Sequence, residues 1–264
     1  MGRVFVFVNQ KGGVGKTTSA INIGAYLAQE GKKTLLVDFD SQANLSGGIG
    51  INPLEPDVYD LIGGAISIED VIRKTSVENL HAIPASIKLS GAAVELIEQE
   101  EKEFFLKKAI APVLNKYDYI LIDCPPSLGI LTLNGMVAAD SAIIPMQCEY
   151  FALEGLTLLL QTIKRIQKIN PVLGIEGIFF TMYDPRTRLA QDVVKQVSTY
   201  FKNKVYKTII PRNIRLSEAP SRGMPISQYD PQCPGARAYH SLSLEIIERA
   251  AHENGAGNEN RGKK

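Results

Sequence analysis

A glycine-rich turn near the N-terminus carries residues that could bind a phosphate group. The turn occupies residues 9–18 and reads NQKGGVGKTT; an apolar run at 4–8 precedes it and a helix-like segment at 20–28 follows it. Glycine lets successive backbone N–H groups converge on an anion, and a helix N-terminus adds unpaired donors and the positive end of its dipole. In this strand–turn–helix setting, Lys16 is expected to reach the β- and γ-phosphates of a nucleotide, and the Thr17 hydroxyl is expected to ligate Mg²⁺.

The turn departs from the usual phosphate-loop pattern G-x-x-x-x-G-K-[ST] at its first position. Gln10 stands where the first glycine is expected, and Lys11 adds a second lysine at the front of the loop. Since Lys16 already serves the β-phosphate, Lys11 is not needed for that contact. It is either a solvated lysine beside the loop or a cation that meets phosphate, including phosphate bound by a neighbouring subunit. We favour the second interpretation.

Three carboxylates follow apolar segments that are expected to form strands. Asp38 and Asp40 come at the end of the run 34–38, and Asp123 ends the run 117–123. In open parallel sheets, ligands bind at the carboxyl ends of the strands. An aspartate that ends an apolar strand is the Walker B arrangement, in which Asp123 would hold Mg²⁺ through a water. The alternative for Asp40 and Asp123 is a structural role as the cap of a turn or helix.

The elements that would position these residues recur along the whole chain. Apolar runs predict four more strands, and apolar residues at helical spacing predict helices between them. Residues 43–64 are rich in Gly, Asn and Pro, which favours loops and short helices. The alternation predicts a doubly wound, mainly parallel α/β sheet flanked by helices, in one domain at 1–251, and the polar tail 252–264 is expected to be disordered. The strands are placed at 80–85, 142–146, 177–182 and 205–210, and the helices at 92–116, 152–168, 189–201 and 235–251.

Composition limits the classes of function. A chain of 264 residues is long enough for one large domain with a substantial core. Its three cysteines form no C-x-x-C pair and its three histidines have no ligand spacing, which disfavours redox chemistry and a metal site made of protein side chains alone. No apolar run approaches about 18 residues, and the N-terminus does not resemble a signal sequence. A soluble, cytoplasmic protein is therefore expected.

Positive charge gathers in one segment of a nearly neutral chain. The formal net charge is +1, but residues 186–222 contain nine basic and two acidic residues, which gives this segment +7 and leaves −6 on the remainder. A basic segment on an otherwise acidic protein is suited to contact with the phosphate backbone of DNA. The alternative is an ordinary solvated helix face. Aromatic residues are not interleaved and no helix-turn-helix precedes the segment, so base-specific recognition is not expected.

Residues 11–17, which read KGGVGKT, resemble the deviant Walker A loop of the ParA/MinD class of P-loop ATPases. Segments 37–44 (VDFDSQAN), 122–127 (IDCPPS) and 210–220 (IPRNIRLSEAP) are similar to the chromosomal, Soj-like ParA branch of that class. One departure is Ser41, where the family usually has proline. The resemblance implies an ATPase with low intrinsic turnover that uses ATP and Mg²⁺. The nucleotide contacts that it implies are Lys11, Gly12, Gly13, Val14, Gly15, Lys16, Thr17, Thr18, Pro211 and Asn213.

The resemblance also assigns roles. Asp40 would orient the attacking water and join Thr17 and Asp123 around the metal, Lys11 and Lys16 would act in catalysis, and Arg186 and Arg215 would contact DNA. The implied protein is an ATP-dependent homodimer that binds DNA non-specifically at the nucleoid and partitions a chromosome or plasmid when a ParB/Spo0J-type partner stimulates hydrolysis.

The main alternative within the same class is a MinD-like ATPase that regulates cell division at the membrane surface. Such a protein would end in an amphipathic basic helix, and the tail at 252–264 has no apolar face. A redox or metal-delivery relative is disfavoured by the unpaired cysteines. A metabolic kinase with the same loop is placed last, since no acceptor pocket is evident in the sequence.

Overall fold

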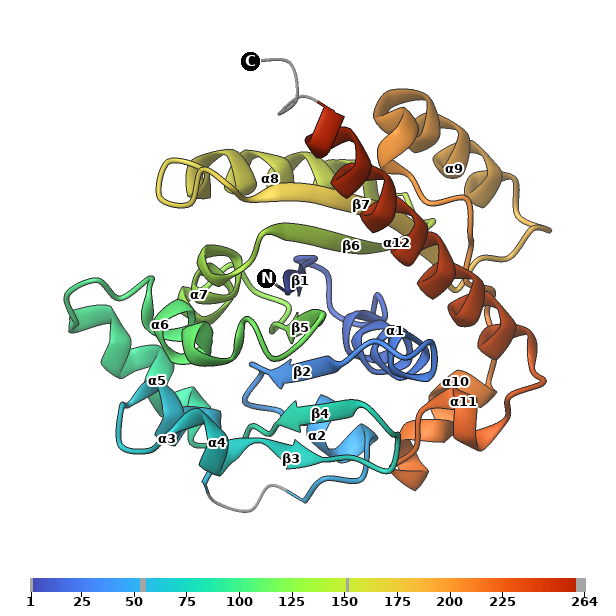
Figure 1. The fold of residues 1–264 in the computed structure, drawn as a ribbon. Helices are drawn as coiled ribbons and strands as arrows, with labels where there is room; N and C mark the ends of the chain where they lie inside the picture. Colours follow the sequence, from blue (N-terminus) through green and yellow to red (C-terminus); the bar gives the residue numbers. More distant parts are fainter. Residues whose placement is uncertain (1, 53–55, 151, 260–264) are drawn as a thin grey trace.

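The central sheet brings the carboxyl ends of its parallel strands to one edge. The computed structural model describes residues 2–52, 56–150 and 152–259, the side chains of 93 and 252–259 excepted. Within these residues the sheet has seven strands in the order β3-β4-β2-β5-β1-β6-β7, and only β3 runs antiparallel to its neighbour (Figure 1). The strands are β1 (Arg3–Phe7), β2 (Thr34–Asp38), β3 (Arg73–Lys74), β4 (Leu80–Ile83), β5 (Tyr119–Asp123), β6 (Ser141–Gln147) and β7 (Gly174–Thr181).

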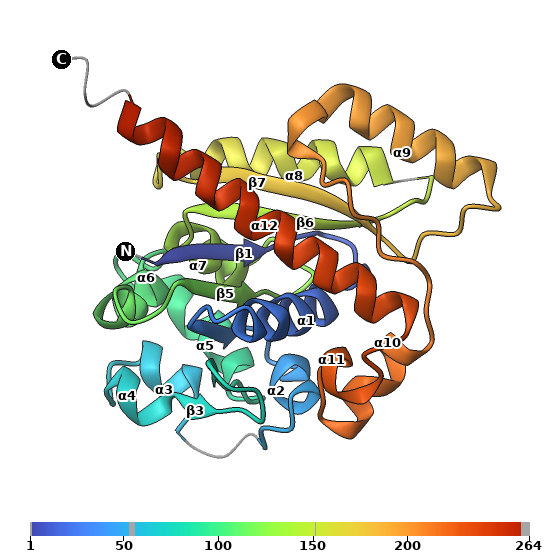
Figure 2. The same cartoon turned by 45° about the vertical axis from the view of Figure 1, so that its right-hand side comes forward.

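Helices cover both faces of the sheet, each over its own apolar core. In β1, Val4 and Val6 belong to one core and Phe5 and Phe7 to the other, as the two-residue period of a strand requires. The helices α1 (Lys16–Gln29) and α12 (Pro234–Glu259) pack on the phenylalanine side, and α7 (Ile130–Ala138) and α8 (Ala152–Ile166) on the valine side (Figure 2). The other helices are α2 (Asn44–Gly48), α3 (Val58–Ile62), α4 (Ile68–Val71), α5 (Leu89–Glu95), α6 (Phe105–Ile110), α9 (Arg188–Phe201), α10 (Arg215–Glu218) and α11 (Ile226–Tyr229).

Strand register places the predicted functional residues together. Asp123 lies opposite Phe7 in the β1–β5 pair and opposite Asp38 in the β2–β5 pair. The turn that follows β1 therefore begins beside Asp123, with Asp38 one strand further along the same carboxyl edge of the sheet. The predicted doubly wound, mainly parallel sheet is confirmed, and β4, β6 and β7 occupy the predicted segments 80–85, 142–146 and 177–182 to within three residues at either end.

The strand predicted at 205–210 is wrong. Val205 makes only an isolated bridge to β7. The backbone N–H groups of Lys207 and Thr208 donate instead to the carboxylate of Glu245 in α12, at 2.9 and 3.2 Å. Because a side chain from another element takes these donors, they are not available for a ladder with a neighbouring strand.

The helix predicted over 92–116 is also wrong as a single element. The segment forms α5, α6 and two 3₁₀ turns, Leu96–Glu98 and Ala111–Val113. Glu101, between α5 and α6, has φ 52°, which is left-handed backbone that ends a helix. Pro112 in the second 3₁₀ turn lacks the N–H that a continuing α-helix needs.

The last helix continues past its predicted end at 251. α12 runs to Glu259, so the backbone of 252–259, in the segment expected to be disordered, is helical in the structure; residues 260–264 lie outside the described residues. None of the helices described is long and apolar enough to cross a membrane. The division into one domain and a tail stays a prediction.

Candidate phosphate-binding site

The turn between β1 and α1 presents backbone donors to an open space. Gly13 and Gly15 have φ values of 73° and 88°, in the left-handed region that glycine adopts without strain. Gly15 is the N-cap of α1, and neither a capping side chain nor an acidic residue in the first turn satisfies the N–H groups of that helix end. These groups are therefore available to an anion.

Lys16 and Asp123 form the buried charged centre of the site. The Lys16 side chain is only 6% exposed, and burial lowers its pKa although the Asp123 carboxylate opposes the shift. Both carboxylate oxygens of Asp123 are buried without a hydrogen-bonding partner of ordinary geometry. Burial, and then the charge of Asp38, raises the pKa of Asp123 to about 8, while the nearby Thr17 hydroxyl and Lys16 ammonium oppose the shift. A buried carboxyl group with unsatisfied oxygens needs a ligand, and a hard cation beside a hydroxyl fits it.

Asp38 and Asp40 lie two residues apart and have different environments. The Asp38 carboxylate accepts hydrogen bonds from the Asp40 N–H at 3.3 Å and from the N–H and hydroxyl of Ser46 at 2.8 and 2.7 Å. Burial raises the pKa of Asp38 to about 6 against these hydrogen bonds. Asp40 instead accepts one bond from the Gln42 N–H at 3.1 Å and faces a cavity. Asp38 therefore fastens the loop, and Asp40 is the carboxylate presented to a ligand.

The cavity at this edge of the sheet has a volume of about 490 Å³, which is in the range of small-molecule sites. It brings together the glycines of the turn, both predicted phosphate-side residues Lys16 and Thr17, and Asp40. Within the described part of the chain, no three His, Cys, Asp or Glu side chains gather closely enough to hold a metal ion unaided. Mg²⁺ would thus be held by Thr17 and Asp123 together with the phosphates. The lining residues are Gly12, Gly13, Gly15, Lys16, Thr17, Thr18, Ile21, Asp40, Gln42, Asn44, Pro126, Met182 and Pro220.

A second cavity of about 360 Å³ adjoins the first, because Gly15, Thr18 and Met182 line both. Pro211 and Asn213, which the sequence predicted as nucleotide contacts, line this second cavity. It is partly apolar, with the side chains of Ile210, Leu216 and Tyr239 in its wall, and has the size and polarity to accept a purine base.

The ends of β6 and β7 support the turn through two residues that were not predicted from the sequence. Gln147 donates from Nε2 to the carbonyl oxygen of Gly13 at 3.0 Å, and the Thr181 hydroxyl donates to the carbonyl oxygen of Val14 at 2.9 Å. Both residues lie at the carboxyl end of an apolar run. That position is the signal that could have identified them.

Lys11 does not line either cavity. Its ammonium forms an ion pair with Glu149, just past β6, and lies 3.4 Å from Gln147 Oε1. The side chain is 49% exposed. The structure thus places Lys11 beside the turn, on the surface, and not in the phosphate cavity of its own chain.

The two arginines predicted to contact DNA lie on loops that touch each other. The Arg212 N–H donates to the carbonyl oxygen of Tyr183 at 3.2 Å, which joins the loop of Arg186 to the loop of Arg215. Each arginine has an acidic partner. Arg186 binds Asp184 with its nitrogen atoms 2.6–3.2 Å from the carboxylate oxygens, and this pairing lowers the pKa of Asp184 to about 2.

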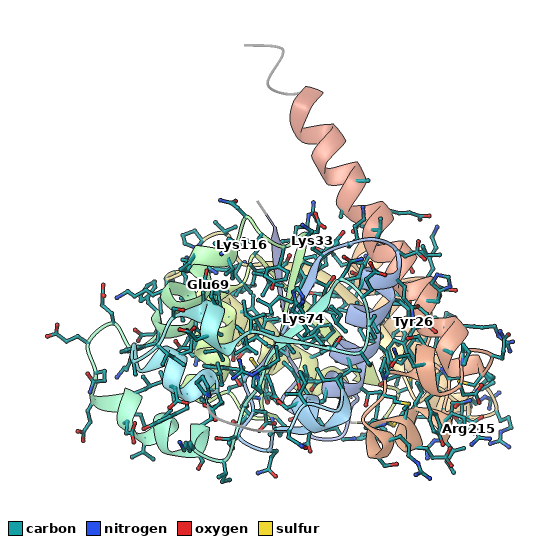
Figure 3. All side chains as sticks on the ribbon, turned by 60° about the horizontal axis from the view of Figure 1, so that its bottom comes forward. Tyr26, Lys33, Glu69, Lys74, Lys116 and Arg215 are labelled. Carbon is teal, nitrogen blue, oxygen red and sulfur yellow. The ribbon has the colours of Figure 1, made fainter. Side chains whose placement is uncertain are left out.

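Arg215 binds Glu218 at 2.9 Å and lies 3.4 Å from an oxygen of Asp230. Figure 3 shows it at the outer surface of the α10–α11 region, away from Lys33 and Lys116.

The chain is similar to known proteins over nearly its whole length. A family described as AAA domain matches residues 2–175. The chain is 66% identical over 250 residues to the chromosome-partitioning ATPase Soj of Treponema pallidum, covering 94% of this chain and 98% of the relative. It is 52% identical over 249 residues to the sporulation initiation inhibitor protein Soj of Bacillus subtilis, covering 93% and 98%. A crystal structure of cobyrinic acid a,c-diamide synthase from Mycobacterium smegmatis with bound ADP and magnesium is similar, with a TM-score of 0.83 and 36% identity over 95% of this chain and 96% of that one.

Proposed function

Because this chain belongs to the Soj/ParA family of chromosome-partitioning ATPases, we propose that it is an ATP-driven switch that moves DNA by cycling between two states. ATP with Mg²⁺ gives a dimer that binds DNA without sequence preference, and hydrolysis to ADP and phosphate returns the monomer. The observation that carries the proposal is the buried Asp123 carboxyl group, which is unsatisfied and lies close to Lys16 and Thr17; these two residues line the phosphate cavity together with Asp40.

The residues of the site divide the work of hydrolysis. The N–H groups of residues 12–18 and the Lys16 ammonium hold the β- and γ-phosphates, and the Thr17 hydroxyl and Asp123 hold Mg²⁺, which neutralises charge on those phosphates. Asp40 accepts a hydrogen bond from the attacking water and orients it toward the γ-phosphorus. Asp38 accepts hydrogen bonds from the Asp40 N–H and from Ser46, and so keeps the loop from Asp40 to Ser46 in place. Pro211 and Asn213 border the base.

Dimerisation would complete the site. Lys11 lies on the surface next to the phosphate cavity, and its only polar partners among the described residues are Glu149 and Gln147, besides the Asn9 oxygen that its N–H binds. A cation in this position can meet the γ-phosphate of a second subunit and neutralise charge that develops as the phosphoryl group is transferred. Leu158 on α8, 45% exposed, adds apolar surface of the kind that a subunit contact covers.

The basic segment 186–222 gives the DNA-binding surface. Its formal charge is +7, whereas the rest of the chain carries −6. One subunit therefore has only this segment to contact DNA phosphates, and its acidic remainder repels the duplex. Two subunits that align their basic segments double the phosphate contacts, and each contact releases counterions. DNA binding would therefore follow dimerisation.

The proposed setting is the nucleoid in the cytoplasm, where a ParB/Spo0J-type partner stimulates hydrolysis and so releases the dimer from DNA. Relatives that are chromosome-partitioning proteins favour this setting over regulation of cell division at the membrane surface.

Size-exclusion chromatography with ATP, with ADP and without nucleotide, each with and without DNA, tests the proposal. Of the three nucleotide conditions, only ATP should give a dimer. A DNA-bound species should form with ATP but not with ADP. A single elution volume under all nucleotide conditions would exclude the switch.

A further inference from the structure

Two glycines join the segment that follows Asp40 to the segment that carries Arg215. Gly50 follows α2 and Gly223 follows the 3₁₀ turn Ala219–Arg222; their φ values are 75° and 64°. A Cβ atom on Gly50 would lie 2.9 Å from the carbonyl oxygen of Gly223, and one on Gly223 would lie 2.8 Å from Cα of Gly50. Both distances are too short for any side chain. The two backbones therefore pack directly on each other, and Figure 2 shows α2 beside the segment that contains α10 and α11.

On one side, the contact is tied to the phosphate cavity. Ser46 in α2 binds the Asp38 carboxylate through both its N–H and its hydroxyl, and the Ile51 N–H binds the carbonyl oxygen of Ser46 at 2.9 Å. The loop from Asp40 to Gly50 is thus held as one piece. A displacement of Asp40 by a bound γ-phosphate or its water would be carried to Gly50.

On the other side, the contact is tied to the DNA loop. The turn Ala219–Arg222 continues directly from α10, which begins at Arg215. The Gly223 N–H donates to the carbonyl oxygen of Pro220 at 3.0 Å and the Met224 N–H to that of Ala219 at 3.3 Å. Arg215 therefore belongs to the same short rigid segment as Gly223.

We propose that the Gly50–Gly223 contact positions the Arg215 loop according to what occupies the phosphate cavity, so that ATP binding is transmitted to the DNA-contacting surface. Two backbones in contact transmit a displacement directly, whereas a flexible side chain between them would absorb it. The DNA part of this inference rests on the proposed function; the coupling between the two segments does not.

Gly50→Ala tests the contact, and Gly64→Ala is its matched control. Gly64 has φ 74°, so alanine carries the same backbone strain there, but a Cβ atom on it would have nothing within 4 Å. Because Gly50 is exposed, the added methyl group can be accommodated by separating the two segments without unfolding the core. Gly223→Ala breaks the same contact from the other side.

ATP should raise DNA affinity equally in the unchanged protein and in Gly64→Ala. In Gly50→Ala and Gly223→Ala this ATP-dependent gain should fall by about tenfold or more, while ATP binding and ATP-dependent dimerisation persist. An undiminished gain in both contact variants would overturn the inference.

Hydrogen exchange gives a readout that does not depend on DNA. A non-hydrolysable ATP analogue should change the protection of the Gly223 and Met224 amides in the unchanged protein and in Gly64→Ala, but not in Gly50→Ala. Neither residue lines either cavity. The carbonyl oxygen of Pro220, which accepts the Gly223 N–H, belongs to a residue that lines the phosphate cavity, so a response that persisted in Gly50→Ala would assign the change to Pro220 and overturn the role of the glycine contact. If exchange responds in this way while no variant binds DNA with ATP, the coupling stands and the DNA part of the proposed function fails. If the amides of the unchanged protein do not respond, the coupling is wrong whatever the DNA result.

Discussion

Lys11, at the front of the phosphate loop, forms an ion pair with Glu149, just past the end of β6. The two side chains are 49% and 55% exposed. An ion pair this exposed contributes little to stability, about 0–1 kcal/mol, because water screens it. Lys11 can therefore leave Glu149 with little loss of free energy when a second subunit offers a phosphate.

Lys11→Ala should leave ATP affinity nearly unchanged and abolish ATP-dependent dimerisation and hydrolysis. The reason is that Lys11 lies outside the cavity of its own chain and would act on the nucleotide of the other. Nucleotide titration, size-exclusion chromatography and phosphate release measure the three properties separately. Glu149→Gln is the control, since it removes the ion pair but keeps the cation, and it should still dimerise. Normal dimerisation and turnover in Lys11→Ala would show that Lys11 is merely solvated.

Lys16→Ala should weaken ATP binding by about 100-fold or more. Lys16 is the buried cation of the cavity, and hydrogen bonds between charged groups contribute about 1.5–3 kcal/mol each. Calorimetric titration measures the affinity, with thermal unfolding to verify that the variant is folded. Lys33→Ala, a change of an exposed lysine away from this cavity, serves as the control. Affinity close to that of the unchanged protein would refute the assignment of the phosphate loop.

The predictions from sequence succeeded where the determining interactions are local. The turn at 9–18 and the strand ends at Asp38 and Asp123 follow from apolar runs next to glycine and aspartate, and parallel register then places them together. Contacts between distant segments were not predictable. Glu149 is 138 residues from Lys11, and nothing in the neighbourhood of either residue indicates the other.

The incorrect strand at 205–210 has the same cause. The segment has the apolar and β-branched residues of a strand, but Glu245 takes two of its N–H groups from the side of α12. The sequence pattern of these six residues contains no information about the Glu245 carboxylate, which belongs to a distant helix. The direct contact between Gly50 and Gly223 was not predictable either, because glycine has no side chain that could contribute to a sequence pattern.

Asp40→Ala should bind ATP and dimerise but lose hydrolysis by about 100-fold, because only the orientation of water is removed. The expected species is a trapped ATP-bound dimer, detected by chromatography after incubation with ATP. Asp38→Ala provides the contrast. It removes the buried acceptor of both Ser46 donors and should lower the free energy of unfolding by about 2–3 kcal/mol. Turnover at the parent rate in Asp40→Ala would require that another group orient the water.

Asp123→Asn should separate metal binding from folding. Both oxygens of Asp123 are buried without a hydrogen-bonding partner of ordinary geometry, and burial raises the pKa of this carboxyl group to about 8. The folded state therefore binds more protons than the unfolded state between the ordinary pKa and about 8, and stability falls as pH rises through that window. The asparagine variant lacks this loss, so its melting temperature without metal should match or exceed that of the unchanged protein at pH 8.

The same variant should lose the extra stabilisation that Mg²⁺ gives in the presence of ATP, because the carboxylate that holds the ion is gone. Thermal shift assays with ATP and either Mg²⁺ or EDTA measure both effects. Retention of the full Mg²⁺ response would assign the ion to other residues.

The arginines on the two joined loops are the basis of the last prediction. Arg186 is paired with Asp184, and Arg215 with Glu218 and Asp230. These pairs lie at the surface, where the arginine side chains are 87% and 50% exposed. Surface pairs of this kind exchange readily for phosphate, which binds guanidinium in the same two-pronged geometry as a carboxylate. The pairing reduces the net charge that each loop presents at the surface, but both guanidinium groups remain accessible there.

Arg215→Glu should abolish DNA binding by the ATP-bound dimer while ATP-driven dimerisation is unchanged, and Arg186→Glu should weaken DNA binding more moderately. The Arg215 side chain is less exposed than that of Arg186, and its loop lines the second cavity, the one of Pro211 and Asn213. We therefore expect the Arg215 guanidinium to be less mobile than the Arg186 guanidinium in the dimer. Filter binding to unrelated duplexes across a salt series measures both the affinity and the number of phosphate contacts. The logarithm of the affinity should fall steeply with the logarithm of salt concentration, and removing one contact per subunit should reduce that slope by about 2 for the dimer.

Lys164→Glu, on α8 and outside the basic segment, is the control. It reverses a positive charge in the same way and should bind DNA nearly as well as the unchanged protein. Equal loss in Lys164→Glu would mean that total charge, and not the position of Arg215, governs binding. Equal affinity of the ADP-bound monomer for DNA would disconnect DNA binding from the nucleotide altogether.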